Sequence, residues 1–432
     1  MNKILETKSK NFDFELQKVL KKRKFDNTAI EKVVQKILQD VKINSDKAVI
    51  RLTKKFDNFN VNSFCQLKVT SDEINTALKI TNKKLINAIR KAYERIKNYH
   101  KRQFPKDDFY KDKQGVLLGS KWNPINSVGL YVPGGTASYP SSVLMNAIPA
   151  IVAGVKRIVM VVPTQKGNMN PSILAAAKVL GINEIYKIGG AQAIGALAFG
   201  TKSIKKVDKI FGPGNAYVAL AKKNVFGTVG IDMIAGPSEI LVVADERNNP
   251  KHIAIDLLSQ AEHDKFAQSI LITPSKTFAE KVNTEINIEL KKLSRVEIAK
   301  KSWNDFGKII VVQNIEECIH LINLIAPEHL ELTITNANEM LKKINNAGAI
   351  FLGKHTPEAI GDYIAGPNHV LPTDRTSKFS SGLNVLDFMK RTSVVRCDLK
   401  SLKKIGPDAI VLAEEEGLGA HALSISTRIQ KK

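Results

Sequence analysis

The sequence predicts an α/β protein with parallel sheets, preceded by a helical N-terminal segment and followed by a small C-terminal tail. Three observations support this fold class. From about residue 127, short β-branched runs alternate with helical segments, and strands that alternate with helices pair in parallel. Before residue 115 the apolar residues recur at helical spacing, and near Ser380 the alternation stops. The 432 residues are enough for two to four domains.

The first 115 residues are expected to be mainly helical and strongly basic. Apolar residues recur at helical spacing from Ile30 to Val41 and again from Leu85 to Ile96. Residues 1–120 hold 28 Lys and Arg against 14 Asp and Glu, more than half of the net charge of +23. A strongly basic chain suggests nucleic acid or an anionic membrane as a partner. The sequence has no concentrated basic stripe and no recognisable binding module, so we expect neither partner.

The alternating region resolves into eight candidate strands with helices between them. The runs expected as strands are 128–132, 158–162, 184–188, 209–211, 240–244, 269–273, 308–312 and 349–352. The segments expected as helices are 171–180, 191–199 and 253–263. A doubly wound sheet built in this way binds ligands at the carboxyl ends of its strands.

Cysteine usage and hydropathy indicate the compartment. Cys65, Cys318 and Cys397 are few, odd in number and far apart, which excludes a disulfide framework and favours a reducing environment. The charged N-terminus has no apolar region typical of a signal peptide, and no apolar run reaches the length of a membrane span. We therefore expect a cytoplasmic protein.

Three glycine-rich junctions follow predicted strands. Pro133-Gly134-Gly135 follows the run 128–132, Gly189-Gly190 follows 184–188, and Gly212-Pro213-Gly214 follows 209–211. Glycine lets the backbone approach a phosphate, and helix N-termini attract anions. Each junction alone is explained by a tight turn, and no GxGxxG fingerprint is present. Three such junctions at strand ends favour a nucleotide or another anionic ligand.

Side chains capable of chemistry gather in four short segments after residue 250. In the first segment, Gln260 and His263 lie one turn apart on a predicted helix and share a face. In the second, Glu328 and His329 follow a helix that ends near Ala326, and we expect them on a loop or at a new helix start.

The other two segments add a possible metal ligand each. Asp362 and His369 flank a glycine turn, and Glu416 and His421 lie in the glycine-rich tail. Zinc takes mixed His and carboxylate ligands, which His263, Asp362 and His421 would supply. A zinc hydrolase with a glutamate base is an alternative, but it would leave the glycine-rich junctions without a role.

Seven motifs occur in a specific order and resemble those of the histidinol dehydrogenase family over about residues 25–428. They are GLYVPGG from Gly129, GGAQAI from Gly189, FGPGN from Phe211, GPSE from Gly236, SQAEH from Ser259, PEHL from Pro327 and GLGAH from Gly417. The resemblance implies an oxidoreductase of histidine biosynthesis that uses NAD and one zinc ion per subunit. It would oxidise L-histidinol through the aldehyde to L-histidine, with two hydride transfers to NAD⁺.

The resemblance also implies an architecture. It predicts two Rossmann-like parallel-sheet domains, both incomplete because GxGxxG is absent. Residues 1–25 would form a helical arm, 26–126 with 239–380 a discontinuous domain with the metal and catalytic residues, 127–238 the NAD-binding domain, and 381–432 a tail domain with dimer contacts. In the implied homodimer, Glu416 and His421 reach the active site of the partner subunit.

Site residues carry over from the family motifs onto this sequence. The implied catalytic pair is Glu328, which activates water, and His329, which accepts protons. The implied metal ligands are Gln260, His263, Asp362 and His421. The implied substrate contacts are Ser238, Gln260, His263, His329, Asp362, His369, Glu416 and His421, and the implied NAD contacts are Tyr131, Gln192 and Asn215. A cysteine nucleophile is not expected, because no cysteine lies in a motif.

Overall fold

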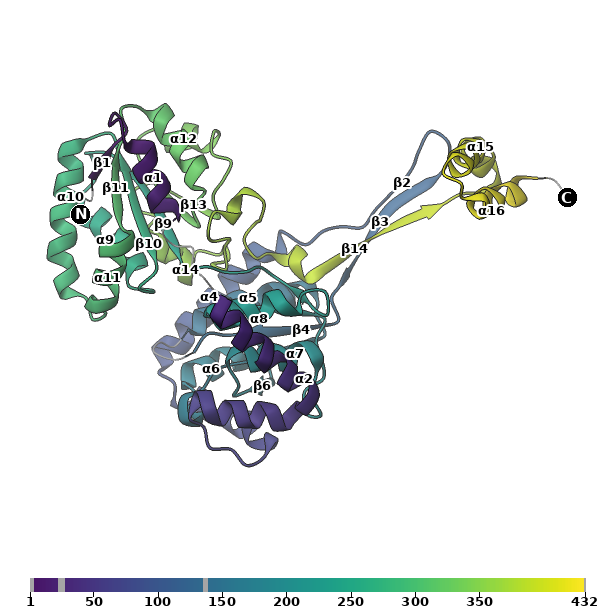
Figure 1. Ribbon diagram of the computed structural model, residues 1–432, viewed down its shortest axis with the longest axis horizontal. Helices are drawn as coiled ribbons and strands as arrows, with labels where there is room; N and C mark the ends of the chain where they lie inside the picture. The colour runs from purple at the N-terminus through teal and green to yellow at the C-terminus, as the bar shows by residue number, and fades with distance from the viewer. Residues whose placement is uncertain (1–3, 22–27, 135–138, 431–432) are drawn as a thin grey trace.

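Two parallel sheets and one antiparallel sheet organise the chain (Figure 1). The computed structural model describes residues 4–21, 28–134 and 139–430. One parallel sheet has six strands in the order β1-β11-β10-β9-β12-β13, and the other has five in the order β6-β5-β4-β7-β8. The three-stranded antiparallel sheet has the order β14-β3-β2. The predicted α/β fold class with parallel sheets is therefore confirmed.

The six-stranded sheet and its helices form one lobe, which we call the six-stranded lobe. Its strands are β1 (Ile4–Glu6), β9 (Glu239–Ala244), β10 (Gln268–Thr273), β11 (Lys308–Val311), β12 (His329–Thr333) and β13 (Ala349–Leu352). Its helices are α1 (Phe12–Lys21), α9 (Pro250–Ala261), α10 (Lys276–Glu289), α11 (Val296–Phe306), α12 (Ile315–Ile325), α13 (Ala337–Leu341) and α14 (Glu358–Tyr363). β9 and β10 are buried along their whole length, because a separate apolar core covers each face of the sheet.

The five-stranded sheet and its helices form the second lobe, called the five-stranded lobe. Its strands are β4 (Ser127–Tyr131), β5 (Arg157–Val161), β6 (Glu184–Tyr186), β7 (Lys209–Phe211) and β8 (Gly230–Ile231). Its helices are α2 (Thr28–Asp57), α3 (Ser71–Ile80), α4 (Lys83–Lys101), α5 (Pro140–Ala153), α6 (Pro171–Val179), α7 (Gly190–Phe199) and α8 (Ala216–Val225). One face of the sheet is covered by α2, α7 and α8, and the other by α3 to α6.

Both lobes share one topology. When β1 is left aside, the first strand of each sheet (β9 or β4) lies in the middle. The second and third strands follow on one side of it, and the fourth and fifth lie on the other. β1 is an additional edge strand, parallel to β11, with Ile4 beside Ile309. The order of connection reverses between β9 and β12 in one lobe and between β4 and β7 in the other, which is where doubly wound sheets bind ligands.

The N-terminal third of the chain packs differently from the expected domain grouping. The helices α2, α3 and α4 cover the five-stranded sheet and not the six-stranded sheet, with which residues 26–126 were grouped. Leu38 and Val41 on α2 lie against α7, where a Cβ on Gly195 would be 3.3 Å from each. The expected arm 1–25 instead contributes β1 and α1 to the six-stranded lobe, with residues 1–3 and 22–27 outside the described part. Helical spacing predicts an apolar face, but it does not predict which sheet the face covers.

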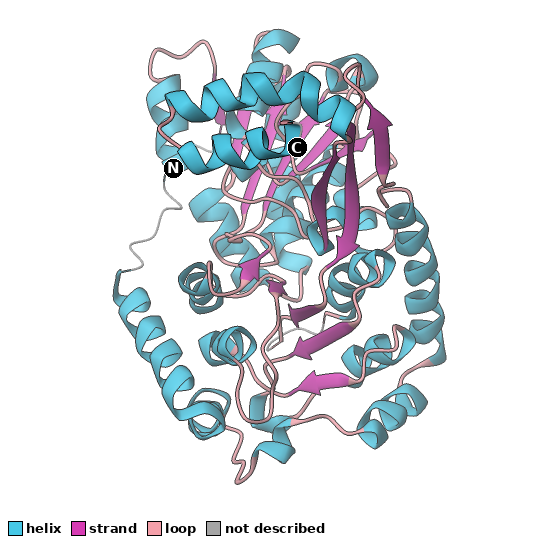
Figure 2. Ribbon diagram, turned by 90° about the vertical axis from the view of Figure 1, so that its right-hand side faces the viewer, coloured by secondary structure: helices cyan, strands magenta, loops and turns pink. Residues whose placement is uncertain are grey.

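An extended arm projects from the junction of the lobes (Figure 1). β2 (Asp108–Lys111), β3 (Leu117–Pro124) and β14 (Met389–Arg396) form its antiparallel ribbon, and β14 runs alongside the whole of β3. At its tip, α15 (Leu399–Glu415) and α16 (Gly419–Ile429) pack against each other. Figure 2 is viewed from the tip side of the arm and shows strands of the upper lobe behind these two helices and the strands of the other lobe below them. The separate C-terminal unit is thus present, although the strands of the ribbon were not predicted.

Residues 364–388 connect the lobes. Asn368 Nδ2 donates a hydrogen bond to the carbonyl of Met145 in α5 over 2.6 Å. The ring of Phe388 stacks on Phe211 of β7 at 3.9 Å between centroids. Short 3-10 helices complete the described structure at Phe64–Leu67, Gln165–Gly167, Leu290–Lys292, Thr376–Lys378 and Val385–Phe388. Among the described helices, none is both long and apolar enough to cross a membrane.

Candidate functional site

A group of buried acidic and histidine side chains lies at the amino edge of the six-stranded sheet. Glu328 lies on the loop that directly precedes β12, as expected, whereas His329 is the first residue of this strand, so the expectation of a loop or helix start was wrong for His329. Ser238 directly precedes β9. The expectation that ligands bind at the carboxyl ends of strands is therefore not met in this lobe.

The adjacent side chains of Glu328 and His329 are both anchored to the backbone of Glu239. Glu328 Oε2 accepts a hydrogen bond from the Glu239 N–H over 2.8 Å. His329 Nδ1 lies 2.9 Å from the Glu239 carbonyl oxygen. Since a carbonyl oxygen can only accept, Nδ1 carries a proton and donates it there. The other ring nitrogen, Nε2, is then left with its lone pair.

The local backbone places this pair. Ala326 ends α12 in the left-handed region, with φ of 51°, and Pro327 follows. Gly348 passes so close that a Cβ there would lie 2.5 Å from the carbonyl oxygen of Glu328. The Ala349 N–H of β13 also donates a hydrogen bond to the Glu328 carbonyl oxygen over 2.9 Å. The turn after α12 and the absence of a side chain at Gly348 together fix the start of β12.

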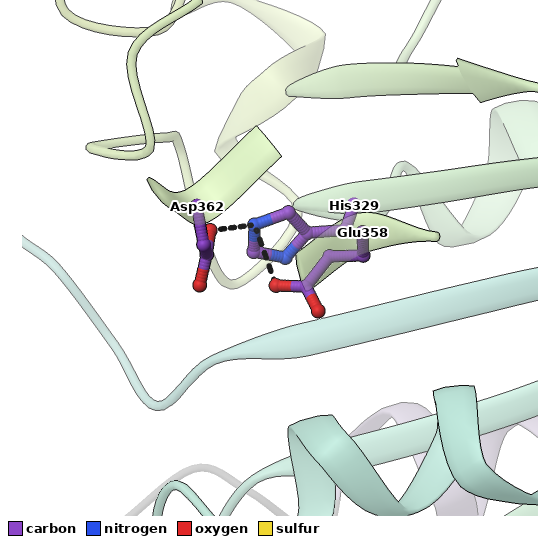
Figure 3. Close-up of side chains that lie close together, drawn as sticks. All are labelled: His329, Glu358 and Asp362. Carbon is purple, nitrogen blue, oxygen red and sulfur yellow. Dashed lines mark ion pairs between the residues drawn. The ribbon is translucent and has the colours of Figure 1, made fainter. Parts of the chain in front are cut away.

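His329 Nε2 faces two carboxyl groups from α14 (Figure 3). It lies 3.6 Å from Glu358 Oε1 and 3.7 Å from Asp362 Oδ1. The ligand atoms of these three residues all lie within 4.8 Å of one another. Among the described residues, neither Nε2 nor Glu358 Oε1 has a hydrogen-bond partner. Such a group of nitrogen and oxygen atoms can hold a metal ion or receive a proton.

Burial sets the protonation of this group. His329 is 3% exposed, and burial lowers its pKa, although the nearby charge of Asp362 acts in the opposite direction. Burial and the charge of Asp362 raise the pKa of Glu358 well above its ordinary value. At neutral pH the imidazole is therefore neutral and can act as a base. Glu358 was not predicted, although it stands one turn before Asp362 on the same helix face, which is a signal that the sequence contains.

His369 lies beside Asp362. Its Nδ1 is 3.0 Å from the carbonyl oxygen of Asp362 and 4.0 Å from the carboxylate oxygen Oδ1. The bond to the carbonyl again assigns the proton to Nδ1, and burial lowers the pKa of the ring. His369 therefore also presents an unprotonated Nε2 to its surroundings.

The end of α9 contributes Gln260 and His263. Helix α14 packs against α9, which brings the end of α9 close to the carboxyl groups of α14. Gln260 is fully buried, and neither its amide nitrogen nor its amide oxygen has a hydrogen-bond partner in the described part of the chain. A positive charge on His263 would lower the pKa of both His329 and His369, so it lies near both rings. Two unsatisfied buried polar atoms on one amide indicate a missing ligand.

Glu416 and His421 are not brought to this site within the chain. Glu416 begins the turn between α15 and α16, directly after the last residue of α15, and His421 lies in the first turn of α16. Both are exposed on the tip of the arm, which stands away from the lobes (Figure 1).

The three expected nucleotide contacts lie at the carboxyl edge of the five-stranded sheet. Tyr131 ends β4, and its hydroxyl oxygen accepts a hydrogen bond from the Gly190 N–H over 3.1 Å. Gln192 is buried in the first turn of α7. Asn215 begins α8, where its Oδ1 accepts from the Val218 N–H over 3.2 Å. The three junctions found in the sequence therefore meet at one edge.

Comparison with known proteins gives a consistent result. A family model for histidinol dehydrogenase matches residues 20–429. A histidinol dehydrogenase of Rhodospirillum rubrum is 56% identical over 403 residues, which cover 93% of both chains. One from Agrobacterium fabrum is 53% identical over 98% of both chains. The crystal structure of histidinol dehydrogenase from Elizabethkingia anophelis matches with a TM-score of 0.93 and 39% identity, over 99% of this chain and 98% of that chain.

Proposed function

This chain belongs to the histidinol dehydrogenase family, and on that premise we propose that it oxidises L-histidinol through L-histidinaldehyde to L-histidine, reducing two molecules of NAD⁺. The observation that carries the proposal is the tautomer of His329. Its Nδ1–H is engaged by the Glu239 carbonyl, which leaves Nε2 as a buried base with no hydrogen-bond partner among the described residues. A substrate hydroxyl at Nε2 would lose its proton as hydride leaves the carbon.

The two oxidations use the pair in different ways. In the first, Nε2 of His329 accepts the hydroxyl proton of L-histidinol. Water then adds to the aldehyde, with Glu328 as the base that takes a proton from the water. In the second, His329 accepts the hydroxyl proton of the hydrated aldehyde. The low pKa that burial gives His329 supports its role as a base at neutral pH.

The donor set fits a zinc ion. We assign the metal to Gln260, His263 and Asp362, with His421 of the partner subunit as the fourth ligand. The buried, unsatisfied amide of Gln260 supports this assignment. When bound, zinc holds the nitrogen atoms of the substrate and fixes its orientation. The alternative set of His329, Glu358 and Asp362 would occupy Nε2 and remove the base.

Metal analysis separates the two assignments. Zinc content measured on purified variants should fall sharply in His263→Asn and remain near one per subunit in Glu358→Gln. The opposite pattern would assign the metal to the group around His329.

The nucleotide is assigned to the carboxyl edge of the five-stranded sheet. Tyr131, Gln192 and Asn215 lie there, at the N-termini of α7 and α8 and the point where the strand order reverses. NAD⁺, when bound, accepts the hydride in each oxidation. A cytoplasmic location is in keeping with this chemistry and with the free cysteines.

The reaction itself provides the first test. Purified protein is incubated with L-histidinol and NAD⁺, and NADH is followed by its absorbance with and without a chelator. We expect two NADH for each L-histidinol consumed and loss of activity after chelation. Zinc-replete protein that forms no NADH would disprove the proposal.

A homodimer with shared sites accounts for the position of the arm. Glu416 and His421 stand far from the other site residues of their own chain (Figure 1), so we propose that they complete the site of the partner subunit. Mixing a Glu328→Gln subunit with a His421→Asn subunit tests this. Each parent is expected to be inactive, and the mixed dimer should regain one working site. If no activity returns, the sites are not shared.

A further inference from the structure

Asp57, the last residue of α2, is a buried acidic side chain. It is 6% exposed, and among the described residues its Oδ2 has no hydrogen-bond partner. Burial raises the pKa of Asp57 to about 6. Thr53, one turn earlier and fully buried, also has a hydroxyl oxygen without a partner in the described part. An isolated buried carboxylate destabilises a fold, which suggests that a ligand completes it.

Asp57 lies at the nucleotide edge of the five-stranded sheet. Burial raises the pKa of Tyr131 to about 12, and the negative charge of Asp57 adds to the shift, so the two groups are close. The Tyr131 hydroxyl oxygen accepts from the Gly190 N–H at the start of α7. The end of α2 therefore lies near Tyr131, which is hydrogen-bonded to the glycine-rich junction at Gly190.

The same segment also reaches the carboxyl end of β5. The ring of Phe59 lies where a Cβ on Gly167 would be only 2.5 Å from its Cε2. Gly167 belongs to the 3-10 helix that follows β5, which is the second strand of this sheet. In doubly wound dinucleotide-binding sheets, an acidic residue after the second strand binds the adenosine ribose. Here residues 162–183, which follow β5, contain no Asp or Glu, so this segment has no acidic residue for that role.

We propose that Asp57 takes this place, accepting hydrogen bonds from the adenosine ribose hydroxyls of NAD⁺ and thereby favouring NAD⁺ over NADP⁺. The inference rests on the proposed use of NAD⁺. A ribose diol supplies two O–H donors for a carboxylate whose Oδ2 has no hydrogen-bond partner among the described residues. A 2′-phosphate would instead bring two negative charges against it.

The test measures binding by calorimetry, which does not depend on turnover. Wild-type protein should bind NAD⁺ more tightly than the analogue without the 2′-hydroxyl of its adenosine, and more tightly than NADP⁺. Asp57→Asn should weaken NAD⁺ binding about ten- to a hundredfold, as expected for a hydrogen bond to a charged group. In this variant the missing 2′-hydroxyl should have little further effect, and the preference over NADP⁺ should shrink. KM for L-histidinol should stay unchanged.

A matched control and a stability measurement separate binding from a structural role. Glu31→Gln removes an acid from the same helix, at a half-buried position where Oε1 lies 3.9 Å from Lys223 Nζ, and should leave NAD⁺ binding unchanged. Because Asp57→Asn removes an unpaired buried charge, its melting temperature should equal or exceed that of the wild type. A lower melting temperature with unchanged nucleotide preference would overturn the inference. Asp57 would then have a structural role at the N-terminus of α7.

Binding measurements on the wild-type protein alone provide a second test of the inference. Equal affinity for NAD⁺ and the 2′-deoxy analogue would also overturn the role of Asp57, while L-histidinol oxidation by the same preparation would leave the proposed function intact. Absence of that oxidation would count against the proposed function instead.

Discussion

The backbone of Glu239 orients two adjacent side chains that a regular strand would direct to opposite faces. Its N–H donates to Glu328 and its carbonyl accepts from His329, so both groups are held by one residue of β9. This anchoring does not depend on the identity of the Glu239 side chain. It explains how consecutive residues can take part in the same reaction.

The close approach of Gly348 to Glu328 leads to a residue-scale prediction. In Gly348→Ala the new Cβ would meet a backbone oxygen at 2.5 Å, which can be relieved only by moving the start of β12. We expect a loss of about 1–3 kcal/mol in stability and a fall in kcat. Thermal unfolding and steady-state kinetics measure the two effects.

The control is Gly353→Ala at the other end of β13. Its Cβ would meet nothing within 4 Å, but its φ of 84° is unfavourable for alanine. About 1–2 kcal/mol of stability should be lost there with kcat unchanged. Equal kcat in both variants would show that the position of Glu328 does not depend on Gly348.

The cysteines provide a second prediction at this scale. Cys318 is 2% exposed on α12, and burial raises the pKa of its thiol to about 12, whereas Cys65 is exposed. Alkylation followed by mass spectrometry should label Cys65 in the native protein and Cys318 only after unfolding. Cys318→Ala should retain NAD-dependent activity. A loss of activity in a folded variant would revive a thiol mechanism.

The sequence predicted several of the residues that the structure brings together. Glu328, His329, Asp362 and His369 lie in one buried group, and Gln260 and His263 lie at its side. Glu239 was not predicted, because it acts through its backbone and its residue type carries no signal. The role of Gln260 as a metal ligand was predicted only through the family resemblance, since an amide is an uncommon metal ligand.

At the scale of elements, the junction between β7 and α8 is held by a buried ion pair. Lys222 and Asp232 form a direct ion pair, with side chains 2% and 1% exposed. Lys222 Nζ donates to the Gly212 carbonyl over 2.9 Å, and Asp232 Oδ2 accepts from the Gly212 N–H over 2.8 Å. Gly212 has φ of 108°, and a Cβ there would lie 2.0 Å from the Tyr131 carbonyl oxygen. The pair therefore fixes the peptide that leads to Asn215.

Breaking this pair should affect stability and nucleotide binding together. Lys222→Met leaves a buried, unpaired Asp232, for which we expect a loss of about 3–5 kcal/mol and weaker NAD⁺ binding. The double variant Lys222→Met with Asp232→Asn should recover part of the stability, because the buried charge is gone. Lys223→Met, an exposed neighbour, is the control and should change neither quantity. Thermal unfolding and calorimetry provide the measurements.

The predictable elements are those with local signals. The buried runs of β9 and β10 were predicted because both of their faces are apolar. β12 was missed because two of its buried residues, His329 and Glu331, are polar and interrupt the apolar run that would predict a buried strand. β2 and β14 were missed because their residues are mostly exposed, and β14 pairs with β3 across more than half of the chain. Such pairing leaves no pattern within a short window.

At the scale of the whole molecule, the tip of the arm exposes an apolar surface. The two helices leave Val411, Leu412 and Leu423 more than 60% exposed, at 64%, 66% and 63%. A group of apolar side chains on an exposed helical hairpin is typical of an interface. The proposed dimer gives it a second copy of the chain as its partner.

A charge in this surface should prevent assembly. Val411→Glu is expected to give a folded monomer with little activity, because burying an unpaired carboxylate is unfavourable and, in the proposed dimer, each site needs the arm of the partner. Light scattering after gel filtration gives the mass, and circular dichroism checks the fold. Lys404→Glu on the same helix is the control for charge change and should remain an active dimer. An active monomer would contradict the shared site.

The large-scale arrangement was only partly predictable. The alternation of strands and helices predicted parallel sheets, but the partner sheet of α2 to α4 depends on surface complementarity that no local pattern contains. The basic first 120 residues contain no site residue that was predicted from the sequence. In the structure its longest helix ends at Asp57, beside the nucleotide edge.

The ribbon of β3 and β14 has a consequence for the time at which a newly made chain becomes active. During synthesis, the five-stranded sheet has all of its strands once Ile231 has been made, whereas Ile4 of β1 must wait for Ile309. β3 waits longer still, for residues 389–396, and the helices of the tip come last. Domains generally fold as units in the order of their synthesis. A chain interrupted between Leu352 and Met389 would therefore have all the strands of both parallel sheets and still lack the arm that we propose it supplies to its partner.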